Sequence, residues 1–173
     1  MADIVDSFDP TLRRRVLRVL ERDARRSAAQ VAAAVGADEA TVAEIIAEAE
    51  RHGVIRRYKT IIGWDRIGEN EKVVAFIDVS VQPERDTGFD HVATRIARFP
   101  EVRSVHLVSG NNDLRIVIEG SSLQAVAAFV AHKLSPLDGV TATETHFLLK
   151  AYKEDGETLT DEMAEDNRLA VAP

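Results

Sequence analysis

The sequence has no cysteine among its 173 residues, which excludes disulfide bonds and metal sites built from thiolates. It also has no apolar run that approaches the roughly 18 residues a helix needs to span a bilayer. The first ten residues, MADIVDSFDP, have neither the basic segment nor the apolar core of a secretory signal peptide. Together these absences predict a cytoplasmic protein without a membrane partner.

An excess of positive charge is also missing. The formal net charge is −7, so the overall electrostatics do not favour nucleic acid. The charge is unevenly spread, however, because the clusters Arg13-Arg14-Arg15, Arg25-Arg26 and Arg56-Arg57 all lie in the first third of the chain. Local clusters decide contact with DNA more than the total does, so this third stays a candidate for binding nucleic acid.

The first third predicts three helices, over residues 9–22, 27–36 and 38–53. A short helix, a tight glycine-containing turn and a longer helix are typical of the helix-turn-helix, whose second helix lies in the major groove. The basic, β-like run 54–62 that follows fits a wing or a linker beside the phosphate backbone. The residues expected to cap the helices are Asp9, Ser27 with Gln30, Gly36 and Asp38.

The remaining two thirds predict the order β-α-β-β-α-β, with strands near 73–81, 102–108, 114–118 and 140–150 and helices near 89–97 and 123–134. This order is the ferredoxin-like split unit, in which two helices cover one face of an antiparallel sheet with strand order 4-1-3-2. The opposite face of the sheet is expected to lie against water or against a second subunit, and its apolar content favours a second subunit. Its predicted members are Phe76, His106, Val108, Val117, Glu144, His146 and Leu148.

Several short motifs together point to one family: Gly53-Val54-Ile55, Phe99-Pro100-Glu101-Val102, the run LVSGNND over residues 107–113, Gly139-Val140 and Thr143-Glu144-Thr145. With them the chain resembles the Lrp/AsnC, or feast/famine, transcription regulators up to about Lys153. The resemblance implies an α+β protein that binds double-stranded DNA and is not an enzyme. It implies homodimers built through the sensor sheet, which assemble into tetramers or octamers.

The resemblance also implies the domain organisation. A winged helix-turn-helix occupies residues 1–62, a linker 63–72, and a ferredoxin-like effector-binding and dimerisation domain (a RAM domain) 73–153. Residues 154–173 form an acidic tail, in which residues 168–171 could dock as a strand on a neighbouring subunit.

The effector site implied by the resemblance lies at the hairpin between the second and third strands of the sensor. An amino acid, the expected effector, presents an ammonium that Asp113 can pair with and a carboxylate that amides around Gly110 can bind. We therefore expect Asp113→Ala to remove the response to the ligand and leave the fold intact. A plain hairpin, in which Asn and Asp only cap the turn, is the alternative. The candidate residues are Leu107, Gly110, Asn111, Asn112, Asp113 and Thr145.

The predicted recognition helix, residues 38–53, differs from a typical DNA-binding helix, because it carries five acidic residues from Asp38 to Glu50 and only Arg51 as a cation. Carboxylates that face phosphates weaken DNA binding. Three explanations stay open: the acidic side chains point away from the groove, affinity comes from multivalency in an oligomer, or DNA binding has been lost. The residues expected to contact DNA are Arg25, Arg26, Thr41, Arg51, Arg56, Arg57 and Lys59.

An enzyme is the other alternative, because sirohaem decarboxylases share this two-domain architecture. His106 with Arg103 or Arg115 could then surround an anionic tetrapyrrole. The five histidines show no close metal-binding spacing, and neither a phosphate-binding loop nor a nucleophile motif is present. The hairpin of residues 109–113 fits the regulators better than the enzymes.

Overall fold

The computed structural model describes residues 8–64, 68, 72–83, 85 and 88–159, and the chain divides into two compact units between Thr60 and Ile61. Each unit has its own hydrophobic core. No helix within the described ranges is both long and apolar enough to cross a membrane. The strand suggested for residues 168–171 lies outside the described residues.

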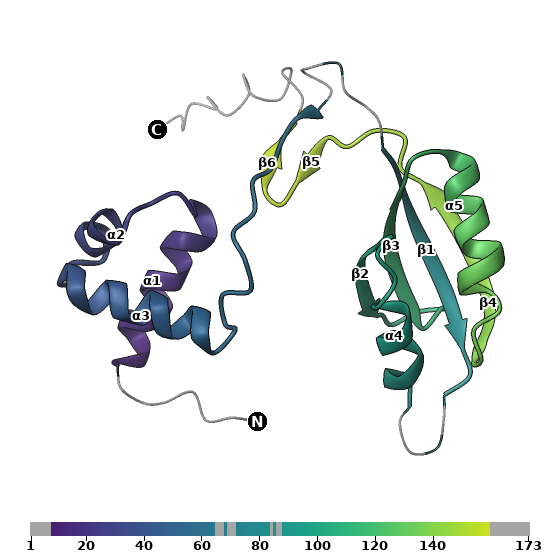
Figure 1. Cartoon of the computed structure of the whole chain (residues 1–173), viewed down its shortest axis with the longest axis horizontal. Helices are drawn as coiled ribbons and strands as arrows, with labels where there is room; N and C mark the ends of the chain where they lie inside the picture. Colours follow the sequence, from purple (N-terminus) through teal and green to yellow (C-terminus); the bar gives the residue numbers. More distant parts are fainter. Residues whose placement is uncertain (1–7, 65–67, 69–71, 84, 86–87, 160–173) are drawn as a thin grey trace, which may run out of the picture. The chain divides into compact units, whose positions relative to one another are not determined.

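The first unit consists of α1 (Pro10–Arg22), α2 (Ala28–Val35) and α3 (Glu39–Arg51) (Figure 1). The predicted caps are confirmed: the Asp9, Ser27 and Asp38 side chains accept backbone N–H groups at the three N-termini. Gly36 ends α2 with a φ of 66°, a left-handed conformation that suits glycine. The apolar sides of the helices meet in a core formed by Val16, Leu20, Val31, Ala32, Val35, Val42 and Ile45.

The segment after α3 differs from the β-like run expected for residues 54–62. Residues 56–63 have neither helix nor strand geometry. The described part of the first unit contains only helices, so this segment has no strand beside it with which to form a ladder of hydrogen bonds.

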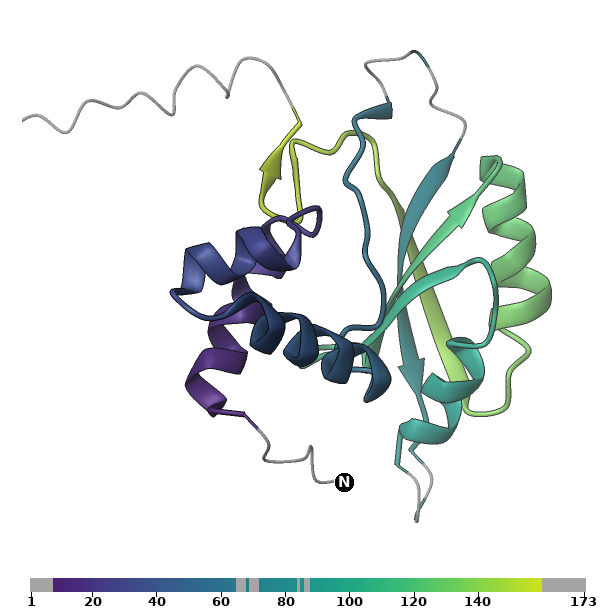
Figure 2. The ribbon, with the colours of Figure 1, turned by 60° about the vertical axis from the view of Figure 1, so that its left-hand side comes forward.

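The second unit has the predicted order: β1 (Val73–Val81), α4 (Asp90–Ile96), β2 (Val102–Leu107), β3 (Leu114–Gly120), α5 (Leu123–Phe129) and β4 (Val140–Phe147). The strands form an antiparallel sheet in the order β2-β3-β1-β4, which confirms the ferredoxin-like fold. Figure 2 shows α4 and α5 on the same side of this sheet. The side chains on that side form the core with residues such as Ile77, Ile96 and Phe129.

Three details differ from the sequence expectation. The last strand ends at Phe147, which pairs with Ala75, instead of at residue 150, although the Leu148 N–H still donates to the Val74 carbonyl at 2.9 Å. The second helix ends in a π-helical turn, η2 (Val130–Leu134). The start of the expected tail forms a small hairpin from β5 (Lys153–Glu154) and β6 (Glu157–Thr158).

Candidate DNA interface and ligand site

The helix α3 is held in the first unit by one side only. Val42, Ile45 and Ala49 on that side are almost completely buried. The N-terminus of α3 is fixed by Asp38, whose Oδ2 accepts the Thr41 N–H at 3.0 Å and the Thr41 hydroxyl at 3.4 Å. The predicted contact residue Thr41 is thus already engaged in the helix cap.

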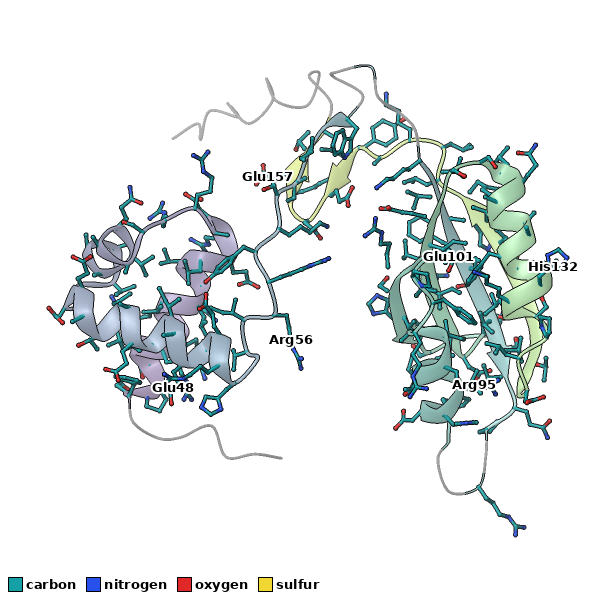
Figure 3. The ribbon with its side chains drawn as sticks, in the orientation of Figure 1. Glu48, Arg56, Arg95, Glu101, His132 and Glu157 are labelled. Atoms are coloured by element: carbon teal, nitrogen blue, oxygen red, sulfur yellow. The ribbon has the colours of Figure 1, made fainter. Side chains whose placement is uncertain are left out.

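The acidic residues of α3 fall into two groups. Glu48 is only 7% exposed and lies on the packed side of the helix (Figure 3), and Glu50 accepts a hydrogen bond from the Tyr58 hydroxyl at 2.7 Å. Glu39 and Glu44 are exposed. Glu48 is therefore withdrawn from the surface, whereas Glu39, Glu44 and Glu50 are exposed on α3, with Glu50 engaged by Tyr58.

The Tyr58–Glu50 hydrogen bond ties the basic segment 56–59 to the last turn of α3. Arg56, Arg57 and Lys59 in this segment are exposed, and the Arg56 guanidinium lies over Gly53. Figure 3 shows Arg56 on the segment that follows α3. The positive charge predicted to contact phosphates is therefore held close to the C-terminal end of the helix.

From the Tyr58–Glu50 hydrogen bond we predict a change in stability at alkaline pH. Burial, followed by the hydrogen bond to Glu50 and its charge, raises the pKa of Tyr58 to about 12. Because the folded pKa is raised above the ordinary value of about 10, the stabilisation is fully present below pH 10 or so and is lost as the pH rises through about 12. Glu50→Gln should return the Tyr58 pKa toward its ordinary value.

The measurement is a titration of tyrosinate absorbance in a Tyr152→Phe background, which leaves Tyr58 as the single tyrosine of the chain. The two proteins to compare are this variant with and without Glu50→Gln. An unchanged Tyr58 midpoint would show that Glu50 does not hold the phenol.

The other predicted DNA contacts lie at the ends of helices. Arg25 and Arg26 are exposed in the turn between α1 and α2, where the carboxylate of Asp23 accepts the Arg25 backbone N–H at 3.1 Å and the Arg26 Nε–H at 3.4 Å. Arg51 is the exposed last residue of α3. The first unit thus combines an acidic and alanine-rich helix surface with cations in the turn before α2 and in the segment after α3.

In the second unit, the hairpin of residues 108–113 is fastened to β1 by its last two side chains. The Asn112 Oδ1 accepts a hydrogen bond from the Ser80 hydroxyl at 2.9 Å. The Asp113 Oδ2 accepts the Val81 N–H at 2.8 Å, at the point where the register between β1 and β4 shifts. Both anchors belong to the base of the hairpin.

The tip of this hairpin faces solvent. Gly110 and Asn111 are exposed, Leu107 is 63% exposed, and Gly110 adopts a φ of 140° that is rare for other residues. Five of the six predicted ligand residues thus lie together. Thr145 pairs with Ile77 on the far side of β1, so the hairpin and Thr145 do not form one site within a single chain.

The sequence analysis missed an ion pair at the centre of the sheet face that lies opposite the helices. Arg115 on β3 donates from Nε and Nη2 to the two carboxylate oxygens of Asp78 on β1, at 2.7 and 2.8 Å. These hydrogen bonds lower the pKa of Asp78, although its burial acts in the opposite direction. The register that pairs the two residues could not be read from alternation alone.

Two histidines frame this face. His146 on β4 places Nε2 3.8 Å from Asp78 Oδ2 and 3.6 Å from Glu144 Oε1. His106 lies on β2, so the two histidines are on opposite edge strands, as predicted. Among the described residues, no three His, Asp or Glu side chains form a group that could hold a metal ion.

Comparison with known families matches both units. The family of winged helix-turn-helix DNA-binding domains matches residues 10–56, and the Lrp/AsnC ligand binding domain matches residues 74–158. The regulator YugG of Bacillus subtilis, an HTH-type transcriptional regulator, is 44% identical over 158 residues, which are 91% of this chain and 95% of that protein. An HTH-type transcriptional regulator of Pyrococcus horikoshii is 30% identical over 140 residues, or 81% of this chain and 85% of that protein.

Solved structures share the fold. The structure of E. coli AsnC aligns with a TM-score of 0.63 and 20% identity, over 85% of this chain and 96% of that one. A transcriptional regulator from Neisseria meningitidis, solved as a complex with L-Met, aligns with a TM-score of 0.65 and 24% identity, over 86% of this chain and 94% of that one.

The fold and the two matched domains define a transcriptional regulator in which a helix-turn-helix DNA-binding domain is joined to a ligand-binding domain. The chain belongs to the Lrp/AsnC family, which confirms the resemblance seen in its motifs.

Proposed function

We propose that this regulator is a homo-oligomer that changes its binding to double-stranded DNA when an amino acid binds at the hairpin of residues 107–113. In this proposal the chain is not an enzyme and needs no resident cofactor, and it acts in the cytoplasm, where its operator lies. The domain boundaries remain those inferred from the sequence: 1–62 for DNA binding, 63–72 for the linker, 73–153 for the effector and dimerisation domain, and 154–173 for the tail.

The proposal rests on the structure of the hairpin, whose base is anchored by hydrogen bonds and whose tip is exposed to solvent. Asn112 and Asp113 are tied to β1, while Gly110 and Asn111 at the tip are exposed. Backbone amides around Gly110 can therefore bind a carboxylate without first ordering a loose loop.

Asp113 supplies the matching anion for the ammonium. A carboxylate has about four acceptor positions on its two oxygens, and one of them is used by the Val81 N–H. The remaining positions can accept a charge-assisted hydrogen bond from an ammonium. The L-Met complex of a regulator with the same fold supports an amino acid as the class of effector.

For DNA binding, the structure favours the first of the three explanations for the acidic helix at one position. Glu48 is packed inside, so its carboxylate does not face phosphates, whereas Glu50 is exposed and accepts a hydrogen bond from the Tyr58 hydroxyl. Cations in the turn before α2 and in segment 56–59 would supply the phosphate contacts. Two DNA-binding units in one oligomer would add avidity to a modest single contact.

The sirohaem decarboxylase alternative loses support, because the two arginines suggested to bind the tetrapyrrole already form ion pairs. Arg115 is bound to Asp78, and Arg103 is bound to Glu119. An anionic tetrapyrrole would have to replace these ion pairs. A visible absorption spectrum after incubation with sirohaem would reverse this preference.

A thermal-shift screen across the twenty amino acids tests the proposal. A ligand that binds only the folded state at a hundredfold excess over its Kd should raise the Tm by roughly 5–10 °C for a chain of this size. A mobility-shift assay with the chain's own upstream region then measures DNA binding with and without that amino acid. If no amino acid raises the Tm, the sensing role is wrong. If the upstream region is not shifted, the protein is a sensor that acts without DNA.

A further inference from the structure

The outer side of α1 carries a row of arginines that the proposed function does not use. Arg14, Arg18 and Arg22 follow one another at intervals of four residues, which places them on one side of the helix. All three are exposed, whereas Val16 and Leu20 on the opposite side of α1 are buried in the core of the first unit. We refer to Arg14, Arg18 and Arg22 as the arginine stripe.

The positive charge of the arginine stripe is not neutralised within the described part of the chain. No carboxylate among the described residues forms an ion pair with any of its three arginines. The single carboxylate of α1, Glu21, is itself exposed. The neighbouring Arg15 differs from the stripe, because its Nη2 donates to the Val35 carbonyl at the end of α2. The stripe is therefore available to an anionic partner.

The stability of α1 does not account for the arginine stripe. A cation in the last turn of a helix interacts favourably with the helix dipole, which accounts for Arg22. It does not account for Arg14 and Arg18, which lie farther from the C-terminal end. Like charges four residues apart on a helix repel each other and destabilise the helix. The stripe is therefore unfavourable in the isolated chain, and a bound polyanion would relieve this repulsion.

The length and composition of the arginine stripe favour a DNA duplex as that polyanion. From Arg14 to Arg22 the helix rises by about 12 Å. Phosphates of one DNA strand recur about every 3.4 Å along the duplex axis, so the stripe is long enough to face several phosphates and too long for a single one. Proteins that bind single strands usually add aromatic side chains on which bases stack, and α1 contains no aromatic residue.

We infer that the arginine stripe binds the phosphate backbone of a second DNA duplex, separate from the duplex that α3 contacts. This inference rests on the proposed DNA-binding function and adds a second surface to it. Val16 of α1 and Ile45 of α3 meet in the same core, so the outer sides of the two helices face in different directions. A duplex that lies along the outer side of α3 therefore leaves the stripe accessible, and one unit can hold two duplexes.

A binding experiment with two duplexes tests this inference in the full chain. The protein is first loaded with just enough upstream duplex to complete the first binding step. A labelled duplex of unrelated sequence is then titrated in, and its fluorescence anisotropy is measured at several salt concentrations. Replacing all three arginines of the stripe with glutamine, which also favours helix, should weaken this second binding at least tenfold and lower its salt slope by about three. The affinity for the upstream duplex should change by less than about threefold, because these arginines do not touch it.

Two further variants control for charge. Arg98→Gln, Lys150→Gln and Lys153→Gln together remove the same charge from exposed positions of the second unit and should leave the second binding unchanged. Glu21→Gln removes the carboxylate of α1 and should strengthen the second binding. It changes a single exposed residue, so it tests the stripe even if the triple glutamine variant of α1 fails to fold.

The possible failures are distinguishable. If the loaded protein does not bind the unrelated duplex, or if the triple variant of α1 binds it as tightly as the unmodified chain, the role of the stripe is wrong. If the upstream duplex is not bound at all, the proposed DNA-binding function is wrong, and the unrelated duplex alone still compares the two proteins. Tighter binding of a labelled single strand than of the duplex would overturn the duplex as the partner of the stripe.

Discussion

Replacing Arg56 and Arg57 together with glutamine should lower the affinity for DNA by about 10- to 100-fold at roughly 0.1 M salt and leave the fold unchanged. Both side chains are exposed and lie in segment 56–59, which follows α3 and is attached to it by the Tyr58–Glu50 hydrogen bond. Because phosphate contacts carry no sequence information, the loss should be similar for all DNA sequences. The slope of log K against log salt should fall by about one for each phosphate contact that is lost.

Fluorescence anisotropy with labelled upstream DNA at several salt concentrations measures both quantities. The matched control is Arg98→Gln with Lys150→Gln, which removes the same charge from exposed positions of the second unit. An equal loss in the control would mean that only net charge matters, and that segment 56–59 is not part of the DNA interface.

Local patterns in the sequence were sufficient for most of the fold. Helix caps such as Asp9 and Ser27 act within three residues of their own position, so spacing alone identifies them. The alternation of β1 likewise fixes which residues face the core, and its bounds, Val73–Val81, match the prediction. These features depend on neighbours in the chain, and a single sequence contains that information.

Contacts between distant segments were not accessible in this way. The Asp78–Arg115 pair spans 37 positions and depends on the register between β1 and β3, which alternation leaves open. The anchoring of Asn112 by Ser80 depends on the same register. The sequence therefore indicated the turn between β2 and β3 correctly, but not that its base is fastened to β1.

The acidic helix α3 shows, within a single unit, that contacts formed by packing could not be predicted from the sequence. The sequence showed that α3 carries several carboxylates, and only packing shows that Glu48 is buried and that Glu50 binds Tyr58. Counting charges along the helix overstates the repulsion that DNA would meet. The charge that remains exposed on α3 lies at Glu39, Glu44, Glu50 and Arg51.

Two substitutions, Asp113→Ala and Asp113→Asn, should separate the proposed ligand-binding role of this residue from its structural role. The bond from the Val81 N–H revises the expectation that Asp113→Ala leaves the fold intact, because alanine removes the acceptor of a partly buried amide. Loss of such a partner costs about 1–3 kcal/mol, so the free energy of unfolding should fall by that amount. Asp113→Asn keeps an acceptor oxygen at the same place and should cost less.

Both variants should lose the thermal shift caused by the amino acid found in the screen, because both lack the charge that pairs with its ammonium. Urea unfolding without ligand gives the stability of each variant, and thermal shift with ligand gives the response. Ser80→Ala is the structural control: it removes the hydroxyl that binds Asn112 and should leave the response in place. If Asp113→Asn still responds to the ligand like the parent, Asp113 only anchors the hairpin, and another group must bind the ammonium.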